Sequence, residues 1–334
     1  MVSAVIFVAT SCVSPLTGFA FWETNLAYEG ESIYNYLQVK NLSDRTILST
    51  NVLFGVQSVT MKDKGLTGMY YDTALAAPAL ADNANSALIL GMGTGTYARQ
   101  LKQYYPKMNI TGVEIDQKIT DLAGEYFDEP ADIPVTTYDG RAWLAASHDK
   151  YDVIMVDAYQ DITIPFQMSS TEFFTMVREH LNPGGVMVVN MNMISDGQGS
   201  INEALSDTIA SVFGNGNTLT ADVPNTTNRE LFAKKPGSGS EENSMQQASK
   251  ALNLRETTYE RTGSKDLEWY MEEVASRFRK VNEPDSASTI LTDDKAPVEV
   301  LGMHAIDQII ADEAGPYRQI LKDEGFGGLL RAVQ

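Results

Sequence analysis

A glycine-rich loop and three acidic side chains follow four successive predicted strands. Gly91-Met-Gly-Thr-Gly95 lies between a short apolar strand and a helix, and the next three strands end near Glu114, Asp139 and Asp157. Glycines let the backbone turn sharply and let a ligand approach the main chain closely. A carboxylate at the end of the second strand can accept hydrogen bonds from both hydroxyls of a ribose. These residues predict a nucleoside-binding site at one edge of a sheet.

The two later acids indicate more specific chemistry. Asp139, which precedes Gly140, can accept a hydrogen bond from an adenine amino group, and it can also cap the helix that begins at Arg141. Asp157 lies where the phosphate or sulfonium end of a nucleotide would bind. A carboxylate there disfavours a phosphate and suits a sulfonium, or an amine that must lose a proton. The four features in this order are typical of S-adenosylmethionine-binding folds, although each alone also fits tight packing or a solvated strand end.

An alternation of strands and helices between residues 87 and 190 must position these side chains. Such alternation predicts a parallel sheet with helices on both faces, and ligands bind such sheets beyond the carboxyl ends of the strands. Residues 31–62 are typical of short antiparallel strands, with a turn at Asn41–Arg45. We therefore expect an α/β fold: a Rossmann-like, doubly wound sheet of the S-adenosylmethionine type with a small N-terminal antiparallel β-hairpin domain.

We expect three parts along the chain. These are an apolar N-terminal segment (1–22), the β-hairpin domain (23–68) and the Rossmann-like domain (69–334), which carries a flexible loop near 235–245. Helices are predicted at Thr73–Asp82, Thr96–Tyr105, Gln117–Phe127, Arg141–Ala146, Thr171–Leu181 and Ile201–Phe213. Strands of the parallel sheet are predicted at Ala87–Leu90, Asn109–Glu114, Val135–Tyr138, Val153–Val156 and Val186–Asn190.

Composition and charge exclude several classes of function. The 334 residues include 44 acidic and 25 basic side chains, a net charge of −19 that repels nucleic-acid backbones. The single cysteine, Cys12, excludes an internal disulfide framework, and the three histidines lie far apart in the sequence. We expect no nucleic-acid partner, no metal site and no tightly bound cofactor.

Residues 1–22 contain no charged side chain and are largely apolar, which leaves two interpretations open. A signal peptide would carry Lys or Arg before its apolar run, and a spanning helix would need about 20 strongly apolar residues. The segment therefore fits either the remnant of a membrane helix or a packed terminal element. We expect a cytoplasmic protein, with membrane attachment through this segment as the alternative.

The sequence resembles the polyamine aminopropyltransferases, the spermidine synthase family, from about Glu31 to Ala233. The motifs that carry the resemblance are Glu31–Leu37, Phe54–Gln57, Leu66–Asp72 with Pro78, Tyr151–Asp157 and Asn182–Gly185. Three further segments look most like the branch in which this domain follows a set of membrane helices: Asp157–Pro165, Leu291–Asp294 and Ala296–Glu299.

The resemblance implies transfer of an aminopropyl group from decarboxylated S-adenosylmethionine to a diamine such as putrescine, giving spermidine and methylthioadenosine. It implies that Asp157 takes the proton of the attacking amine and that Tyr70 helps to hold this amine. It places the donor substrate on Asn35, Gln57, Gly91, Gly93, Thr94, Gly95, Glu114, Asp139 and Gly140. It places the polyamine acceptor on Tyr71, Tyr159 and Asp161, and it implies a homodimer.

Three departures from the family pattern keep two other functions open. Thr94 stands where the family carries an aspartate for the donor's amine, Asp161 lies one residue later than the family's second acid, and Tyr71 replaces a glutamine. The first alternative is an S-adenosylmethionine-dependent methyltransferase, which Thr94 favours. The second is a non-catalytic module that binds polyamines or nucleosides.

Overall fold

The structure is a computed structural model of the chain. It describes residues 23–51, 56–128, 130, 132–158, 164–191, 199–237, 253–286, 288–303 and 322. Residues 1–22 and most of the loop expected near 235–245 lie outside these described residues.

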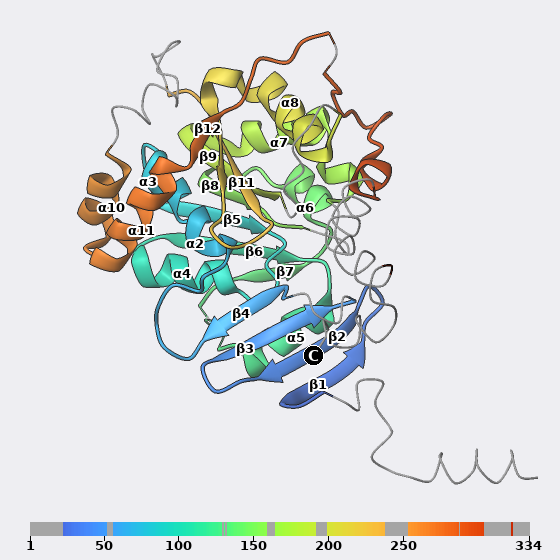
Figure 1. The fold of residues 1–334 in the computed structure, drawn as a ribbon, viewed down its shortest axis with the longest axis vertical. Coiled ribbons are helices and arrows are strands. Elements are labelled where there is room, and N and C mark those ends of the chain that lie inside the picture. Colours follow the sequence, from blue (N-terminus) through green and yellow to red (C-terminus); the bar gives the residue numbers. More distant parts are fainter. Residues whose placement is uncertain are drawn as a thin grey trace, which may run out of the picture.

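The larger of two sheets has eight strands in the order β12-β10-β11-β9-β8-β5-β6-β7 (Figure 1). The five strands from β9 to β7 pair in parallel, and β11, β10 and β12 extend one edge in antiparallel fashion. The strands are β5 (Ser86–Leu90), β6 (Asn109–Glu114), β7 (Val135–Thr137), β8 (Tyr151–Val156), β9 (Leu181–Met191), β10 (Thr218–Asp222), β11 (Arg229–Lys234) and β12 (Phe278–Lys280).

Helices cover both faces of this sheet because its central strands are apolar on both sides. Side chains alternate between faces along a strand, so Ile89 packs in one core and Leu88 and Leu90 pack in the other. The helices that contribute to the first core are α2 (Tyr70–Ala74), α3 (Ala76–Leu80), α4 (Thr96–Tyr104), α10 (Leu254–Thr262) and α11 (Lys265–Ser276). The second core contains α6 (Gly140–Ala146), α7 (Thr171–His180) and α8 (Ile201–Phe213). The predicted doubly wound α/β fold is confirmed.

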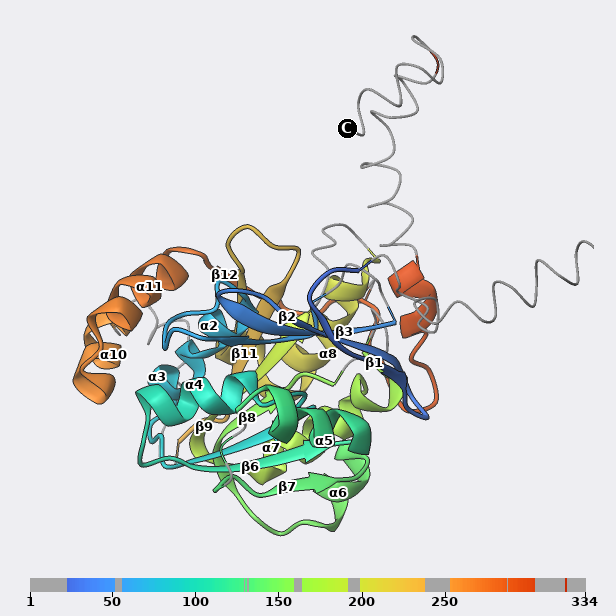
Figure 2. The ribbon, with the colours of Figure 1, turned by 90° about the horizontal axis from the view of Figure 1, so that it is seen from below.

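The N-terminal region forms a separate four-stranded antiparallel sheet in the order β1-β2-β3-β4. Its strands are β1 (Leu26–Glu31), β2 (Tyr36–Asn41), β3 (Arg45–Thr50) and β4 (Ser58–Met61). This sheet lies against α5 (Gln117–Tyr126) of the larger sheet (Figure 2). A small core joins the two units, with Leu37, Val39 and Leu48 packed against Ile119, Leu122 and Phe127. The predicted antiparallel N-terminal strands are therefore present.

The predicted helix Thr73–Asp82 differs from the structure, which contains two shorter helices. α2 ends at Ala74, and α3 begins at Ala76. Pro78 has no N–H group and cannot donate to the carbonyl of Ala74, so a continuous helix would lack that bond. The expected division between residues 68 and 69 falls between β4 and α2, and the division itself stays a prediction.

Among the described residues, none of the helices has the length and apolar character needed to cross a bilayer. The apolar segment 1–22 is not among them.

We expect Phe127→Ala to lower the free energy of unfolding by about 3–5 kcal/mol. The Phe127 ring is fully buried in the small core that joins the N-terminal sheet to α5. Urea unfolding measures the change. Phe166→Ala is the matched control, because Phe166 is 50 % exposed, and its loss of stability should stay below about 1 kcal/mol. Equal losses in the two variants would contradict a core at this position.

Candidate active site

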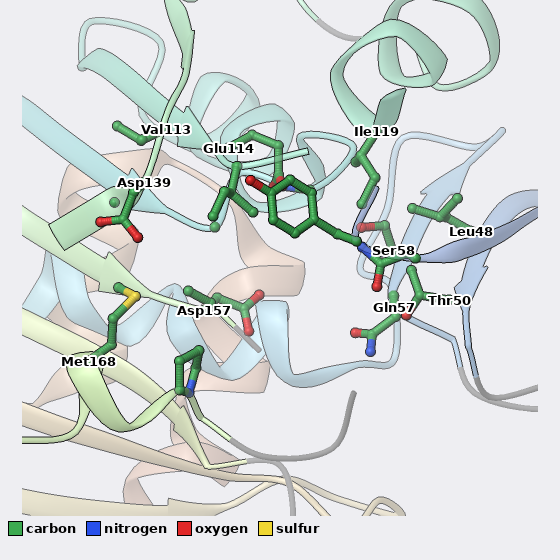
Figure 3. A pocket seen from close by; sticks show the side chains of 18 of the residues that line it. Leu48, Thr50, Gln57, Ser58, Val113, Glu114, Ile119, Asp139, Asp157 and Met168 are labelled. Carbon is green, nitrogen blue, oxygen red and sulfur yellow. The ribbon is translucent and has the colours of Figure 1, made fainter. Parts of the chain in front are cut away.

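A cavity of about 270 Å³ opens at the carboxyl ends of the parallel strands, beside the N-terminal sheet. Figure 3 shows Asp157 between Glu114 and Asp139 on one side and Gln57 and Ser58 on the other. Ten residues predicted from the sequence border this cavity: Asn35, Gln57, Tyr70, Tyr71, Gly91, Gly93, Glu114, Asp139, Gly140 and Asp157. The position agrees with the rule that ligands bind such sheets beyond the strand ends.

The glycine-rich loop brings its backbone against that of Asp157. Gly91 has a φ of +88°, a conformation that favours glycine, and its N–H donates to the carbonyl of Val113 over 2.9 Å. A Cβ atom at Gly91 would lie 2.6 Å from the carbonyl carbon of Asp157 and 2.9 Å from the nitrogen of Ala158. A side chain at this position would therefore push the loop and the end of β8 apart.

Glu114 is buried at the end of β6, where two backbone N–H groups fix its carboxylate. Oε2 accepts from the N–H of Gly93 over 2.8 Å, and Oε1 accepts from the N–H of Asp116 over 3.0 Å. Burial raises the pKa of Glu114, and these backbone hydrogen bonds oppose the rise. Each carboxylate oxygen can accept more than one hydrogen bond, so both retain acceptor capacity toward the cavity. This arrangement suits a pair of neighbouring hydroxyls.

Asp116 links the part of the cavity wall at Glu114 to the N-terminal sheet, and the sequence analysis did not identify it. Its Oδ2 accepts from the Ser32 hydroxyl over 2.5 Å and from the Asn35 amide over 3.0 Å. Asn51 in turn donates to Asn35 Oδ1 over 2.9 Å. Asp116 also caps α5, accepting from the N–H of Lys118. Its place as a helix cap two residues after Glu114 is the signal that could have found it.

Asp139 both caps a helix and borders the cavity. Its Oδ1 accepts from the N–H of Ala142 over 2.7 Å at the start of α6. Cap formation by this oxygen leaves Oδ2 without that bond, so the capping role and a ligand-binding role are compatible. Tyr138 and Met168 also border the cavity. They supply apolar surface beside the carboxylate.

Two side chains hold the carboxylate of Asp157. The Tyr70 hydroxyl donates to Oδ2 over 2.7 Å, and the Asn190 amide donates to Oδ1 over 3.0 Å. Burial raises the pKa of Asp157 to about 7, against the lowering effect of these two bonds, and the charge of Glu114 raises it further. An acid with this pKa can exchange a proton near neutral pH. The sequence analysis missed Asn190, whose signal is a polar residue at the end of an apolar strand.

Tyr70 owes its position to the segment that precedes α2. The fully buried carboxylate of Asp72 accepts from the N–H groups of Thr67 and Gly68 over 2.9 and 2.7 Å, which fixes this segment. The rings of Tyr70 and Tyr71 lie 4.0 Å apart between centroids, and the Tyr71 hydroxyl donates to the carbonyl of Gln57 over 2.7 Å. Burial, and then the charge of Asp157, raise the pKa of Tyr70 well above its usual value, so Tyr70 stays a proton donor.

Two of the predicted site residues do not border this cavity, and two more are not described. Thr94 and Gly95 do not border it. Thr94 is fully buried, and its Oγ1 has no hydrogen-bond partner among the described residues, while Gly95 precedes α4 with a φ of +79°. Tyr159 and Asp161 lie outside the described residues.

A family model described as "Spermine/spermidine synthase domain" matches residues 69–235. A curated relative from Bifidobacterium longum (strain NCC 2705), "Probable polyamine aminopropyl transferase", is 99 % identical over 334 residues, which is all of this chain and 75 % of that protein. The chain belongs to the spermine/spermidine synthase family. The predicted family, and with it the predicted class of polyamine aminopropyltransferase enzymes, is confirmed. The expected closeness to a branch with membrane helices is not borne out.

More distant relatives match part of the chain in sequence, and solved structures share its fold. "Polyamine aminopropyltransferase" from Vibrio vulnificus (strain CMCP6) is 28 % identical over 209 residues, 60 % of this chain and 69 % of that protein. The crystal structure of a probable spermidine synthase from Corynebacterium glutamicum ATCC 13032 has a TM-score of 0.56 at 21 % identity, covering 80 % of this chain and 99 % of that one. A spermidine synthase in complex with the transition state analogue AdoDATO has a TM-score of 0.53 at 20 % identity, covering 63 % of this chain and 74 % of that one.

We expect Gly91→Ala to destabilise this family member by about 1–3 kcal/mol and to lower its activity, because the new Cβ meets the backbone of Asp157. Thermal unfolding and a turnover assay measure the two effects. Gly124→Ala in α5 is the control, since nothing beyond its chain neighbours and the backbone of its own helix lies within 4 Å of its Cβ position, and it should gain up to about 1 kcal/mol. An unchanged Gly91→Ala protein would show that the contact with β8 is unimportant.

Proposed function

We propose that this chain transfers an aminopropyl group from decarboxylated S-adenosylmethionine to a diamine such as putrescine, giving spermidine and methylthioadenosine. The observation that carries the proposal is the carboxylate of Asp157, held by Tyr70 and Asn190 at the end of β8 beside the cavity. An amine nucleophile must be neutral, and its unperturbed pKa is near that of lysine, about 10.4. A fixed carboxylate with a raised pKa supports the removal of its proton.

The bond changes of the proposed reaction balance without a further reactant. The amine lone pair attacks the carbon of the aminopropyl group that is bonded to sulfur, and a carbon–nitrogen bond forms. The carbon–sulfur bond breaks, its electron pair stays on sulfur, and the positive charge of the sulfonium is lost. Asp157 takes the proton that the attacking nitrogen loses. Tyr70 and Asn190 orient this carboxylate, which favours a near-attack geometry.

The proposed donor site lies on the opposite side of Asp157 from Asn190. Glu114 binds the two ribose hydroxyls, Asp139 accepts from the adenine amino group beside Gly140, and Gly91 and Gly93 let the donor approach the backbone. Asn35 and Gln57 belong to the wall supplied by the N-terminal region. The neighbouring acids attract a cationic sulfonium and disfavour phosphate, which supports a sulfonium donor over a dinucleotide.

Several finer expectations from the sequence stay proposals. These are donor contacts from Thr94 and Gly95, acceptor contacts from Tyr71, Tyr159 and Asp161, and a homodimer in the cytoplasm. The proposal also includes decarboxylated S-adenosylmethionine as a co-substrate that is consumed in each turnover, and no tightly bound cofactor.

We expect wild-type protein to form spermidine from putrescine and decarboxylated S-adenosylmethionine, and Asp157→Asn to lower kcat by roughly 10²–10⁴-fold, since the amide cannot take the proton. Chromatography of the products measures turnover. Calorimetry should show that the wild type and Asp157→Asn bind methylthioadenosine with affinities within about threefold of each other. Asp149→Asn, an exposed site with the same charge change, is the control. Methyl transfer from S-adenosylmethionine would instead support a methyltransferase, and binding without turnover a non-catalytic module.

As the pH is lowered, we expect kcat/KM for the acceptor to fall more steeply below pH 7 than above it. Above pH 7 only the amine gains a proton, whereas below it Asp157, whose pKa is about 7, becomes protonated as well. The hydrogen bond from Tyr70 lowers the pKa of Asp157, so Tyr70→Phe should move this inflection to higher pH. Rate profiles between pH 5 and 9 make the comparison. Tyr105→Phe, a buried tyrosine elsewhere in the core, should leave the inflection in place. A shift to lower pH in Tyr70→Phe would contradict the assignment.

A further inference from the structure

A second carboxyl group, that of Glu230 in β11, lies buried near the candidate site without a role in the reaction described above. Its side chain is fully buried. Neither Oε1 nor Oε2 has a hydrogen-bond partner within the described part of the chain. A buried carboxyl without partners is costly, and such a group calls for an explanation such as strain, a catalytic role, or a bound water or ion.

The strand register places Glu230 in one lateral row with Asp157. Glu230 is paired with Asn190 across β11 and β9, and Val156 is paired with Val189 across β8 and β9. The next residues in that second pair are Asp157 and Asn190, so all three side chains point to the same face of the sheet. Two strand spacings separate the Cα atoms of Asp157 and Glu230 by roughly 10 Å. Asn190 lies between them and donates its amide to Asp157.

The surroundings of Glu230 contain acidic and neutral groups. Burial, and then the charge of Asp157, raise the pKa of Glu230 well above its usual value. The Tyr97 hydroxyl donates to the carbonyl of Ala74 instead of to Glu230, and Arg229, the preceding residue, pairs with Asp222. No ion pair to Glu230 occurs among the described residues. The described part of the chain therefore offers no cation to the ionised form of Glu230, and a cationic ligand would stabilise that form.

We propose that Glu230 is a specificity-determining residue that selects acceptors carrying a second cationic amine. This inference rests on the proposed function, in which the reacting amine lies at Asp157 and Tyr70. A diamine bound there has its other ammonium one short alkyl chain away, and the row of side chains leads from Asp157 to Glu230. Attraction between opposite charges is strong where water is excluded. A monoamine of equal length has no second charge and gains nothing from Glu230.

The test compares putrescine with butylamine, which has the same four carbons and one amine. Calorimetry on protein saturated with methylthioadenosine should show that the wild type prefers putrescine. Glu230→Gln, which keeps the shape of the side chain, should weaken putrescine roughly thirtyfold or more. Its affinities for butylamine and methylthioadenosine should change by less than about threefold. Glu273→Gln, an exposed site with the same charge change, should match the wild type.

Each outcome separates this inference from the proposed function. Equal putrescine affinities in Glu230→Gln and wild type would overturn the role of Glu230, even if spermidine forms normally. A wild type that binds both amines equally, or neither, would also overturn it, whether or not the variant folds. Conversely, a selective loss of putrescine binding in a protein that shows no aminopropyl transfer would support Glu230 while the proposed reaction fails.

Discussion

The pair of hydrogen bonds that Tyr70 and Asn190 donate to Asp157 is the constraint on which the site depends. They come from a helix that follows the N-terminal sheet and from the strand next to β8, so three elements must meet before the carboxylate is fixed. Burial and these donors act on its pKa in opposite directions, and burial dominates. The balance leaves an acid that can change its protonation state near neutrality, while the tyrosine beside it keeps its proton.

Much of the fold was predictable because its signals are local. β6 and α8 match their predicted bounds, because an apolar pattern marks each of them and Ser200 caps α8. The order of the glycine loop, Glu114, Asp139 and Asp157 along the chain also predicted one shared sheet edge, because parallel strands end on the same side. The interrupted helix near Pro78 was missed, since an Ala- and Leu-rich stretch outweighed one missing N–H group.

The parts of the site that sequence reasoning missed depend on pairings between distant segments. Asn190 reaches Asp157 only because β9 lies beside β8, and Asp116 meets Ser32 and Asn35 only because the N-terminal sheet packs on α5. The register of β11 against β9, which places Glu230 beside Asn190, likewise depends on tertiary structure. Local patterns cannot give these contacts, because the residues are 33 to 84 positions apart in three of them.

The chain of hydrogen bonds from Asn51 through Asn35 and Asp116 to Glu114 has a thermodynamic consequence. One carboxyl oxygen of Glu114 accepts from the backbone N–H of Asp116, which anchors the β1–β2 turn, so the cavity and the small sheet share a structural element. By linkage, any molecule that tightens this wall on binding must also resist separation of the two sheets. Binding in the cavity and the packing of the N-terminal sheet on the larger sheet are then thermodynamically coupled, so that each strengthens the other.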